Sequence, residues 1–257
     1  MNKLLFKFIQ INIYKGKYLG DLLKFLKKEQ ADFIAMQEVT SGPANLTFDF
    51  KGDIFEHFKK ELGMSGVFHK DTDITTNPPS KDGNALLSKF PIVRSKVITL
   101  KAPMVILYDQ TKDVSFFPFY PRHLLDAIVD VGGERVHAIS WHGAWTAPPT
   151  DTAETLRQAK IVTDYLKSIS EPFILGCDLN SVIQNKTVDL INKVANNLMF
   201  GSGVLQTTHP KAHKIVPRGY LVDYIFTSKH FQLKSIRVPE ILVSDHLPVV
   251  GEVEFLL

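Results

Sequence analysis

The chain has 257 residues, of which 44% are hydrophobic and 22% are charged, and its formal net charge is +3. This composition is ordinary for a folded soluble protein and supplies ample material for a core. The single cysteine, Cys177, excludes an intrachain disulfide, and no apolar run approaches the roughly 18 residues of a membrane-spanning helix. The mildly basic charge is compatible with a polyanionic ligand but does not require one.

In the first half of the chain, apolar runs and alternation predict strands, and leucines or phenylalanines at helical spacing predict helices. The predicted strands are residues 4–13, 33–37, 85–88 and 93–100, and the predicted helices are residues 18–30 and 54–62. The segment 71–82 is rich in Thr, Pro, Asp and Ser, so we predict a loop there.

In the second half, strands at 124–131 and 135–140 form a predicted hairpin about Gly132-Gly133, a favourable turn dipeptide. Further predicted strands are residues 173–177, 220–227, 231–238 and 247–255, predicted helices are 152–169 and 188–198, and a proline-rich loop is predicted at 146–150. Because strands outnumber helices and the helices fall between groups of strands, we predict a layered α/β fold. No linker or repeat interrupts the chain, so we expect one domain over residues 1–257.

Polar residues of a few types recur at or near the ends of the predicted strands. The series is Asn12, Glu38, His142, Asp178, Asn180, Asp223, Asp245 and His246. A set of carboxylates with two histidines projecting from strand ends is what divalent-metal phosphoester hydrolysis requires. The pattern therefore predicts a hydrolytic site built around a divalent metal ion.

The ordered motifs of this chain resemble the endonuclease/exonuclease/phosphatase superfamily. That superfamily includes DNase I, exonuclease III-type repair nucleases, inositol polyphosphate phosphatases, neutral sphingomyelinases and deadenylases. The motifs are Ile11-Asn12, Gln37-Glu38, Gly83-Asn84-Ala85-Leu86-Leu87-Ser88, Trp141-His142, Gly176-Cys177-Asp178-Leu179-Asn180, Val222-Asp223-Tyr224 and Ser244-Asp245-His246. The resemblance covers nearly the whole chain and implies a four-layer αββα sandwich, in which two mixed β-sheets pack face to face with helices outside.

Three of these residues are the predicted metal ligands. The resemblance makes Glu38 the principal ligand, and hard Mg²⁺ or Mn²⁺ prefers such carboxylate oxygens. Asn12 can present its amide oxygen to the metal or to a metal-bound water, and Asp245 is a further ligand or a partner through water. Outside this series, Glu38 would be read as a surface acid and Asn12 as a residue that turns the chain at a strand end.

The predicted catalytic residues are Asp178, Asn180, His142, Asp223 and His246. The resemblance assigns Asp178 to the activation of a water and Asn180 to a phosphate oxygen, although the pair can also form an Asx turn. A carboxylate at one nitrogen of His246 would fix its tautomer and raise its pKa, and in relatives the Asp223 position provides that carboxylate. His142 is expected to donate to a nonbridging oxygen or to the leaving group. Alternatively, His142 is an ordinary polar histidine, and Asp223 is a buried acid whose hydrogen bonds are satisfied.

Three more residues are predicted to contact the substrate. Asn84 belongs to a common block of the superfamily and is expected to contact a phosphate or to position a catalytic neighbour. Arg122 offers a guanidinium fork suited to phosphate, although a surface salt bridge explains it equally well. Trp145 can stack on a base or sugar, or can close a hydrophobic loop. The remaining histidines have no motif to support them: His57, His69, His123, His137, His209, His213 and His230.

The expected reaction is in-line attack of water on a phosphoester, without a covalent intermediate. The leading hypothesis is a Mg²⁺- or Mn²⁺-dependent endonuclease or exonuclease acting on DNA or RNA, which predicts a positive groove beside the site. A phosphatase or phosphodiesterase of a small molecule or lipid headgroup predicts a closed pocket instead, and a nonenzymatic binding module is the third hypothesis.

The N-terminal apolar stretch is interrupted by Lys7 and lacks a small-residue cleavage site, so we expect a cytoplasmic protein. We also expect a monomer.

Overall fold

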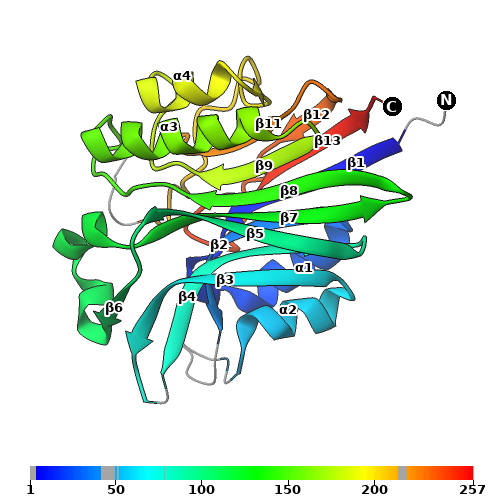
Figure 1. Ribbon diagram of the computed structural model, residues 1–257. Coiled ribbons are helices and arrows are strands. Elements are labelled where there is room, and N and C mark those ends of the chain that lie inside the picture. The colour runs from blue at the N-terminus through cyan, green and yellow to red at the C-terminus, as the bar shows by residue number, and fades with distance from the viewer. Residues whose placement is uncertain (1–3, 42–49, 51, 78, 214–218, 257) are drawn as a thin grey trace.

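Two β-sheets pack face to face, and helices cover both outer surfaces (Figure 1). The computed structural model describes residues 4–41, 50, 52–77, 79–213 and 219–256. The α-helices are α1 (Leu19–Glu29), α2 (Ile54–Leu62), α3 (Ala153–Ser168) and α4 (Lys186–Asn192), and the short 3-10 helices are η1 (Tyr14–Gly16), η2 (Tyr108–Lys112) and η3 (Val114–Phe119). In Figure 1, α3 and α4 lie above the paired sheets and α1 and α2 lie below them, so the predicted four-layer αββα sandwich is confirmed.

Among the described residues, the first sheet has seven strands in the order β12-β13-β1-β2-β4-β3-β6. They are β1 (Leu4–Asn12), β2 (Phe33–Ser41), β3 (Ser65–Thr75), β4 (Ser80–Ser88), β6 (Met104–Leu107), β12 (Phe231–Arg237) and β13 (Val249–Phe255). Strand β1 pairs parallel with β2, and Asn12 lies opposite Gln37 in the register. The parallel pairing therefore brings the ends that carry Asn12 and Glu38 to one edge of the sheet.

The second sheet has six strands in the described part of the chain, in the order β10-β11-β9-β8-β7-β5. They are β5 (Ile92–Lys101), β7 (Arg122–Val131), β8 (Glu134–His142), β9 (Phe173–Asp178), β10 (Asn196–Asn197) and β11 (Asp223–Thr227). In the register, His142 lies opposite Asp178 across the parallel β8–β9 pair, and Asp223 lies opposite Asp178 across the antiparallel β9–β11 pair. Three predicted site residues are thus neighbours on three adjacent strands.

Apolar faces hold the four layers together. Leu22 and Leu26 of α1 and Phe58 of α2 are buried against the outer face of the first sheet, whereas Ala159 and Val162 of α3 are buried in the cluster of the second. Each fully buried large side chain contributes roughly 1.5–3 kcal/mol relative to exposure. The helices are therefore outer supports, and they leave the strand ends free to carry the polar residues.

The predicted loop at residues 71–82 is wrong, because most of that segment is strand. It covers the end of β3 and the start of β4, which pair antiparallel with Thr72 opposite Asp82. The register shifts between Lys70 and Thr72, so Asp71 is the extra residue of a β-bulge. Backbone pairing with β4 offsets the poor strand propensity of this Thr- and Asp-rich stretch, and that pairing is invisible in a local pattern.

Other boundaries differ from the prediction at strand and helix ends. The helix expected at 188–198 ends at Asn192, and Asn196–Asn197 form the short strand β10. Asn197 donates to the side chain of Asn192 and accepts from the backbone of Met199, and such side-chain bonds compete with helix continuation. The strands expected at 220–227 and 247–255 begin later, at Asp223 and Val249.

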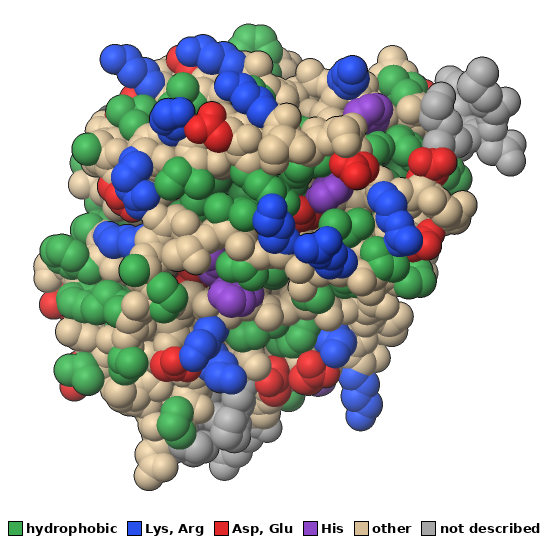
Figure 2. Space-filling model, in the orientation of Figure 1, with side chains coloured by type: hydrophobic (Ala, Val, Ile, Leu, Met, Phe, Trp, Pro, Cys, Tyr) green, Lys and Arg blue, Asp and Glu red, His purple; other side chains and the backbone are tan. Residues whose placement is uncertain are grey.

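Two surface properties bear on the kind of partner. None of the helices in the described residues is long and apolar enough to cross a membrane. On the face shown in Figure 2, lysine and arginine side chains lie scattered among aspartate and glutamate side chains. That face therefore carries no continuous basic strip.

Candidate active site

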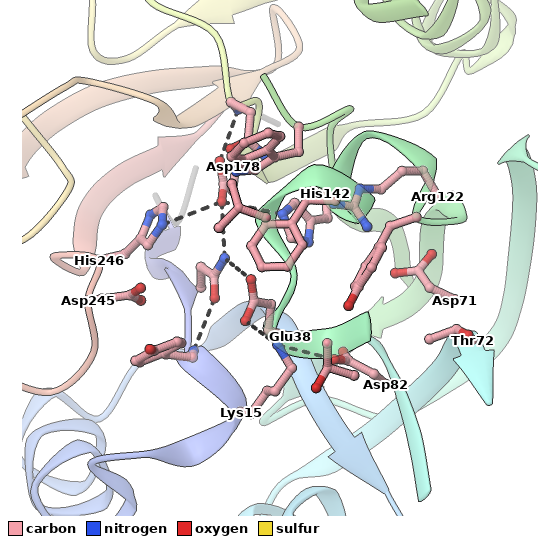
Figure 3. Close-up of a pocket in the computed structure, with 18 of the residues that line it drawn as sticks. Lys15, Glu38, Asp71, Thr72, Asp82, Arg122, His142, Asp178, Asp245 and His246 are labelled. Atoms are coloured by element: carbon pink, nitrogen blue, oxygen red, sulfur yellow. Dashed lines mark hydrogen bonds and ion pairs between the residues drawn. The ribbon is translucent and has the colours of Figure 1, made fainter. Parts of the chain in front are cut away.

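A pocket of about 380 Å³ opens where the ends of β1, β2, β8 and β9 meet, and it gathers most of the predicted site residues (Figure 3). Nine of the eleven line it: Asn12, Glu38, Arg122, His142, Trp145, Asp178, Asn180, Asp245 and His246. The other two do not line it. Asp223 lies behind His246, and Asn84 is fully buried, with its amide nitrogen donating to the carbonyl of His123 at 3.2 Å.

Four pocket residues have backbone conformations that are rare for residues with side chains: Tyr14, Lys15, Glu38 and Asn180. Glu38 has a φ of 53° and Asn180 a φ of 49°, both in the left-handed region. The pairing of β2 with β4 shifts register between Met36 and Val39, so β2 bulges at Glu38 and the carboxylate faces the pocket. Such conformations cost about 1–3 kcal/mol each and concentrate at functional sites.

Glu38 lies at the centre of the pocket floor and is held by two partners (Figure 3). The Nζ of Lys15 lies 3.0 Å from its Oε2, and the amide nitrogen of Asn12 donates to its Oε1 at 3.2 Å. Burial opposes ionisation, but the Lys15 ammonium outweighs it and holds the pKa of Glu38 well below its usual range. Glu38 is therefore a carboxylate at neutral pH.

Asn12 links the two central carboxylates. Its amide nitrogen also donates to Oδ2 of Asp178 at 3.1 Å, and its amide oxygen accepts the backbone N–H of Tyr14 at 3.0 Å. The nitrogen of Asn12, and not the oxygen expected to face a metal, is thus directed at Glu38. Asn12 holds Glu38 and Asp178 in a fixed relation, which the sequence did not predict.

Asp178 lies between two imidazoles. Its Oδ2 is 3.6 Å from Nε2 of His142 and 3.8 Å from Nε2 of His246. The backbone N–H of Asn180 donates to its Oδ1 at 3.0 Å, so the Asx turn weighed from the sequence is present. The Asx turn does not exclude a place in the pocket for both residues. It uses only Oδ1 of Asp178 and leaves Oδ2 toward the pocket.

His246 forms the predicted pair with Asp223. The Nδ1 of His246 lies 2.8 Å from Oδ2 of Asp223, and both side chains are buried. Burial alone lowers the pKa of His246, but the carboxylates of Asp223 and Asp178 outweigh it and raise the pKa well above the ordinary value. His246 is therefore an imidazolium whose Nε2–H points toward Asp178.

His142 has the opposite charge state. Burial, with the nearby Arg122 guanidinium, lowers the pKa of His142 to about 3. His142 is therefore neutral at pH 7, and one of its nitrogens can donate while the other accepts. Neighbouring titratable groups with pKa values pushed apart are typical of acid–base sites.

Oxygen donors around Glu38 suit a hard divalent cation. Burial raises the pKa of Asp245 to about 6, and Glu38 adds to the rise, so a cation between these carboxylates would relieve their repulsion. His213, Asp245 and His246 bring ligand atoms within 4.8 Å of one another. Because an imidazolium cannot ligate a metal, His246 fits that role poorly.

The predicted substrate contacts divide into two cases. Arg122 is buried in the pocket wall, where its Nε donates to the carbonyl of Gly143 at 2.8 Å and its Nη1 to that of Pro121 at 3.0 Å. Its Nη2 has no hydrogen-bond acceptor among the described residues, so it is available to a ligand. Trp145 is half-buried and meets Phe117 edge to face, with ring centroids 5.4 Å apart, so it closes an aromatic wall of the pocket.

Sequence reasoning missed several pocket residues. Lys15, Asp71, Asp82 and Tyr120 line the pocket, and His213, left without a motif, lies with its ring centroid 5.5 Å from that of His246. Asp82 directly precedes the Gly83-Asn84 motif, which was the one available signal. Burial, opposed by the Lys15 ammonium, raises the pKa of Asp82 to about 7.

Comparison with known proteins relates the chain to one family. The sequence matches the endonuclease/exonuclease/phosphatase family over residues 9–246. No curated protein has a significant sequence match to the chain.

Solved structures share the fold at low identity. A family protein from Bacteroides vulgatus has a TM-score of 0.72 and 16% identity, covering 98% of this chain and 99% of that chain. A mannosyl-6-phosphatase from Bacteroides thetaiotaomicron has a TM-score of 0.70 and 15% identity, covering 96% of this chain and 99% of that chain. The human Nocturnin catalytic domain has a TM-score of 0.67 and 17% identity, covering 99% of this chain and 96% of that chain.

At these identities the solved structures support the fold alone. The sequence match, by contrast, covers the segment from β1 to the motif that contains His246. The chain belongs to the endonuclease/exonuclease/phosphatase family and is a phosphoester hydrolase.

Proposed function

We propose that the chain hydrolyses the phosphoester of a small molecule by in-line attack of water, with a divalent metal ion. The observation that carries this proposal is the pocket of about 380 Å³, in which carboxylates and two imidazoles of opposite charge state share one floor. A pocket walled by side chains suits a compact ester, whereas a polynucleotide needs a groove with phosphate contacts along it. One structural neighbour is a mannosyl-6-phosphatase, which agrees with a compact ester.

The chemical roles follow from charge and position. Asp178, flanked by two imidazoles, accepts the proton of the attacking water as the new P–O bond forms and the bond to the leaving oxygen breaks. His246, cationic through Asp223, donates from Nε2 to a phosphoryl oxygen and neutralises charge that grows there. Neutral His142 and the amide of Asn180 supply further donors.

The metal is expected at the oxygen donors around Glu38. Glu38, Asp245 and, after rotation of its amide, Asn12 would hold Mg²⁺ or Mn²⁺. A bound divalent cation supplies charge stabilisation to a phosphoryl oxygen and is worth several kcal/mol in such reactions. Lys15 would then lose its contact with Glu38 and keep its pairing with Asp82, which lies 3.7 Å away.

A substrate comparison tests the small-molecule proposal. Purified protein with Mn²⁺ or Mg²⁺ is assayed on p-nitrophenyl phosphate, on a panel of sugar and nucleoside monophosphates, and on single-stranded DNA, duplex DNA and RNA oligonucleotides. We expect turnover of small phosphoesters and slow or no cleavage of the oligonucleotides, because a pocket of about 380 Å³ suits a compact ester.

The nuclease hypothesis from the sequence stays a prediction, and the same assay decides it. Efficient oligonucleotide cleavage that falls steeply with added salt would contradict the small-molecule proposal and favour a nuclease. Asp189→Asn, which removes an exposed charge from α4, is the matched control for each active-site variant.

A further inference from the structure

The pocket has a second polar end that the hydrolytic groups do not explain. Asp71, Thr72 and Asp82 come from β3 and β4 and lie on the opposite side of Glu38 from His246 and Asp245 (Figure 3). A phosphate held between the metal donors and His246 would direct its ester substituent toward this end. We call Asp71, Asp82 and Arg122 the distal end of the pocket.

The distal end is built by a defined backbone irregularity. Two consecutive residues, Asp71 and Thr72, are both buried, which breaks the alternation of a regular strand and marks the bulge. Gly83 lies opposite Lys70 beside the bulge, and a Cβ added there would lie 2.1 Å from the carbonyl oxygen of His69. Close packing of backbone on backbone therefore requires glycine here and directs both Asp71 and Asp82 into the pocket.

Each carboxylate at the distal end is held firmly but keeps accepting capacity. Oδ1 of Asp71 lies 2.5 Å from Nδ1 of His123, and both side chains are buried. The Asp82 side chain is 10% exposed and makes a 3.7 Å contact with Lys15, but it accepts no hydrogen bond from any residue that the structure describes. Asp82 lines the pocket, so its carboxylate oxygens are open to a donor on a bound group.

The chemistry of this end selects a hydroxyl group. A hydroxyl donates one hydrogen bond and accepts others at the same time, so it can donate to Asp82 or Asp71 while it accepts from Nη2 of Arg122 or Nζ of Lys15. An alkyl group would leave these polar atoms unsatisfied, and an ammonium group could donate to the carboxylates but could not accept from the two cations. The aromatic side chains of Phe117, Tyr120 and Trp145 line the remaining wall and offer apolar contact to the carbon skeleton.

We propose that the distal end binds the hydroxyl groups of a polyhydroxylated leaving group, so that the substrate is the phosphoester of a sugar or polyol. This inference rests on the proposed function, because it concerns the leaving group of the same hydrolysis. It assigns Asp82 and Asp71 to substrate selection.

Three matched six-carbon substrates test the inference. Sorbitol 6-phosphate carries hydroxyls, hexyl phosphate carries none, and 6-aminohexyl phosphate carries a cation. For the wild-type protein we expect kcat/KM for sorbitol 6-phosphate to exceed that for hexyl phosphate by roughly tenfold or more, as for loss of a hydrogen bond to a charged group. A ratio near one, or a preference for the aminohexyl ester, would overturn the inference.

Variants locate the selectivity at the distal end. Asp82→Asn and Asp71→Asn are expected to reduce the sorbitol-to-hexyl ratio, mainly through a higher KM for sorbitol 6-phosphate. Asp73→Asn removes a charge from the neighbouring position of the same strand, where the side chain is 41% exposed and pairs with Lys70, and is expected to keep the ratio. An unchanged ratio in both distal-end variants, with a thermal unfolding profile like the wild type, would contradict the assignment.

The proposed function and the inference can fail separately. Metal-dependent hydrolysis of p-nitrophenyl phosphate without preference among the six-carbon esters would leave the proposed function standing and refute the inference. If no phosphoester is hydrolysed, calorimetric titration of the three esters into the protein with Mg²⁺ still decides the inference. Tighter binding of sorbitol 6-phosphate supports the distal end, and equal or absent binding of all three overturns it.

Discussion

Two imidazoles approach the same oxygen of Asp178, and their surroundings give them opposite charges. His246 has Asp223 on its far nitrogen and is protonated, whereas buried His142 lies near Arg122 and is neutral. The same residue type thus supplies a fixed cation and a neutral donor within one pocket. Burial lowers both pKa values, and only His246 has a carboxylate on Nδ1 that outweighs it, so the difference depends on the second sheet that positions Asp223.

Replacement of Asp223 by Asn tests the charge on His246. The folded-state pKa of His246 is raised, so its protonated form persists at neutral pH and is lost as pH rises through that pKa. Without the Asp223 charge the pKa falls, so the alkaline limb of the pH profile of kcat/KM should move to lower pH. At neutral pH we expect a loss of roughly tenfold or more, within the range of general acid–base effects.

A second buried histidine–aspartate pair, in the same sheet as Asp223, provides a control for Asp223→Asn. Nδ1 of His137 lies 2.6 Å from Oδ2 of Asp126, remote from the pocket. Asp126→Asn should lower stability through the same kind of lost bond but should leave the pH profile in place. An alkaline limb that stays fixed in Asp223→Asn, or moves equally in Asp126→Asn, would contradict the assigned role of His246.

At the scale of elements, bulges and strand ends shape the site. Strand β2 bulges at Glu38 and β3 bulges at Asp71, and each bulge directs a carboxylate into the pocket. Parallel pairing of β8 with β9 places His142 beside Asp178. The regular parts of these strands form the core, and their irregular parts carry the polar residues.

Gly83→Val tests the close backbone approach at the β3 bulge. The added Cβ would lie 2.1 Å from the carbonyl oxygen of His69, so β3 must shift. We expect a loss of about 1–3 kcal/mol in the free energy of unfolding, a range usual for overpacking, and weaker discrimination among substrates at the distal end. Chemical denaturation of the variant measures the loss.

Gly20 provides the control for this glycine. It lies in α1, and a Cβ added there would meet no heavy atom of the described residues within 4 Å, so Gly20→Ala should keep or slightly raise stability. Equal stability of Gly83→Val and the wild type would show that the bulge does not depend on glycine.

The sequence predicted those site residues that a local pattern marks. Asp178, Asn180 and His142 follow apolar runs, so a strand-end interpretation found them, and the order of motifs predicted the four-layer fold. It did not find Lys15, Asp71 or Asp82, because their meeting in one pocket depends on strand pairing and, for Asp71, on a bulge. A Thr- and Asp-rich stretch resembles a loop until a partner strand supplies its backbone bonds.

At the scale of the whole molecule, a buried polar network joins the two sheets beneath the pocket. Gln37 of β2 donates to the hydroxyl of Ser140 in β8 at 3.0 Å and to the side chain of Gln10 in β1 at 3.0 Å. Gln10 donates in turn to Asp223 of β11 at 3.3 Å, which joins residues 213 positions apart in the chain. Satisfied buried networks of this kind fix the register of the packed layers, so the site depends on the assembly of both sheets.

Hydrolysis of p-nitrophenyl phosphate with and without metal, by the wild type and Asp178→Asn, tests the central claim most directly. We expect EDTA to abolish turnover, Mg²⁺ or Mn²⁺ to restore it, and Asp178→Asn to reduce kcat by roughly 10²–10⁴-fold, as for loss of a general base. Asp178→Asn should remain folded, and Asp189→Asn should act like the wild type. Turnover that survives both EDTA and the loss of the Asp178 carboxylate would contradict a metal-dependent hydrolytic site in this pocket.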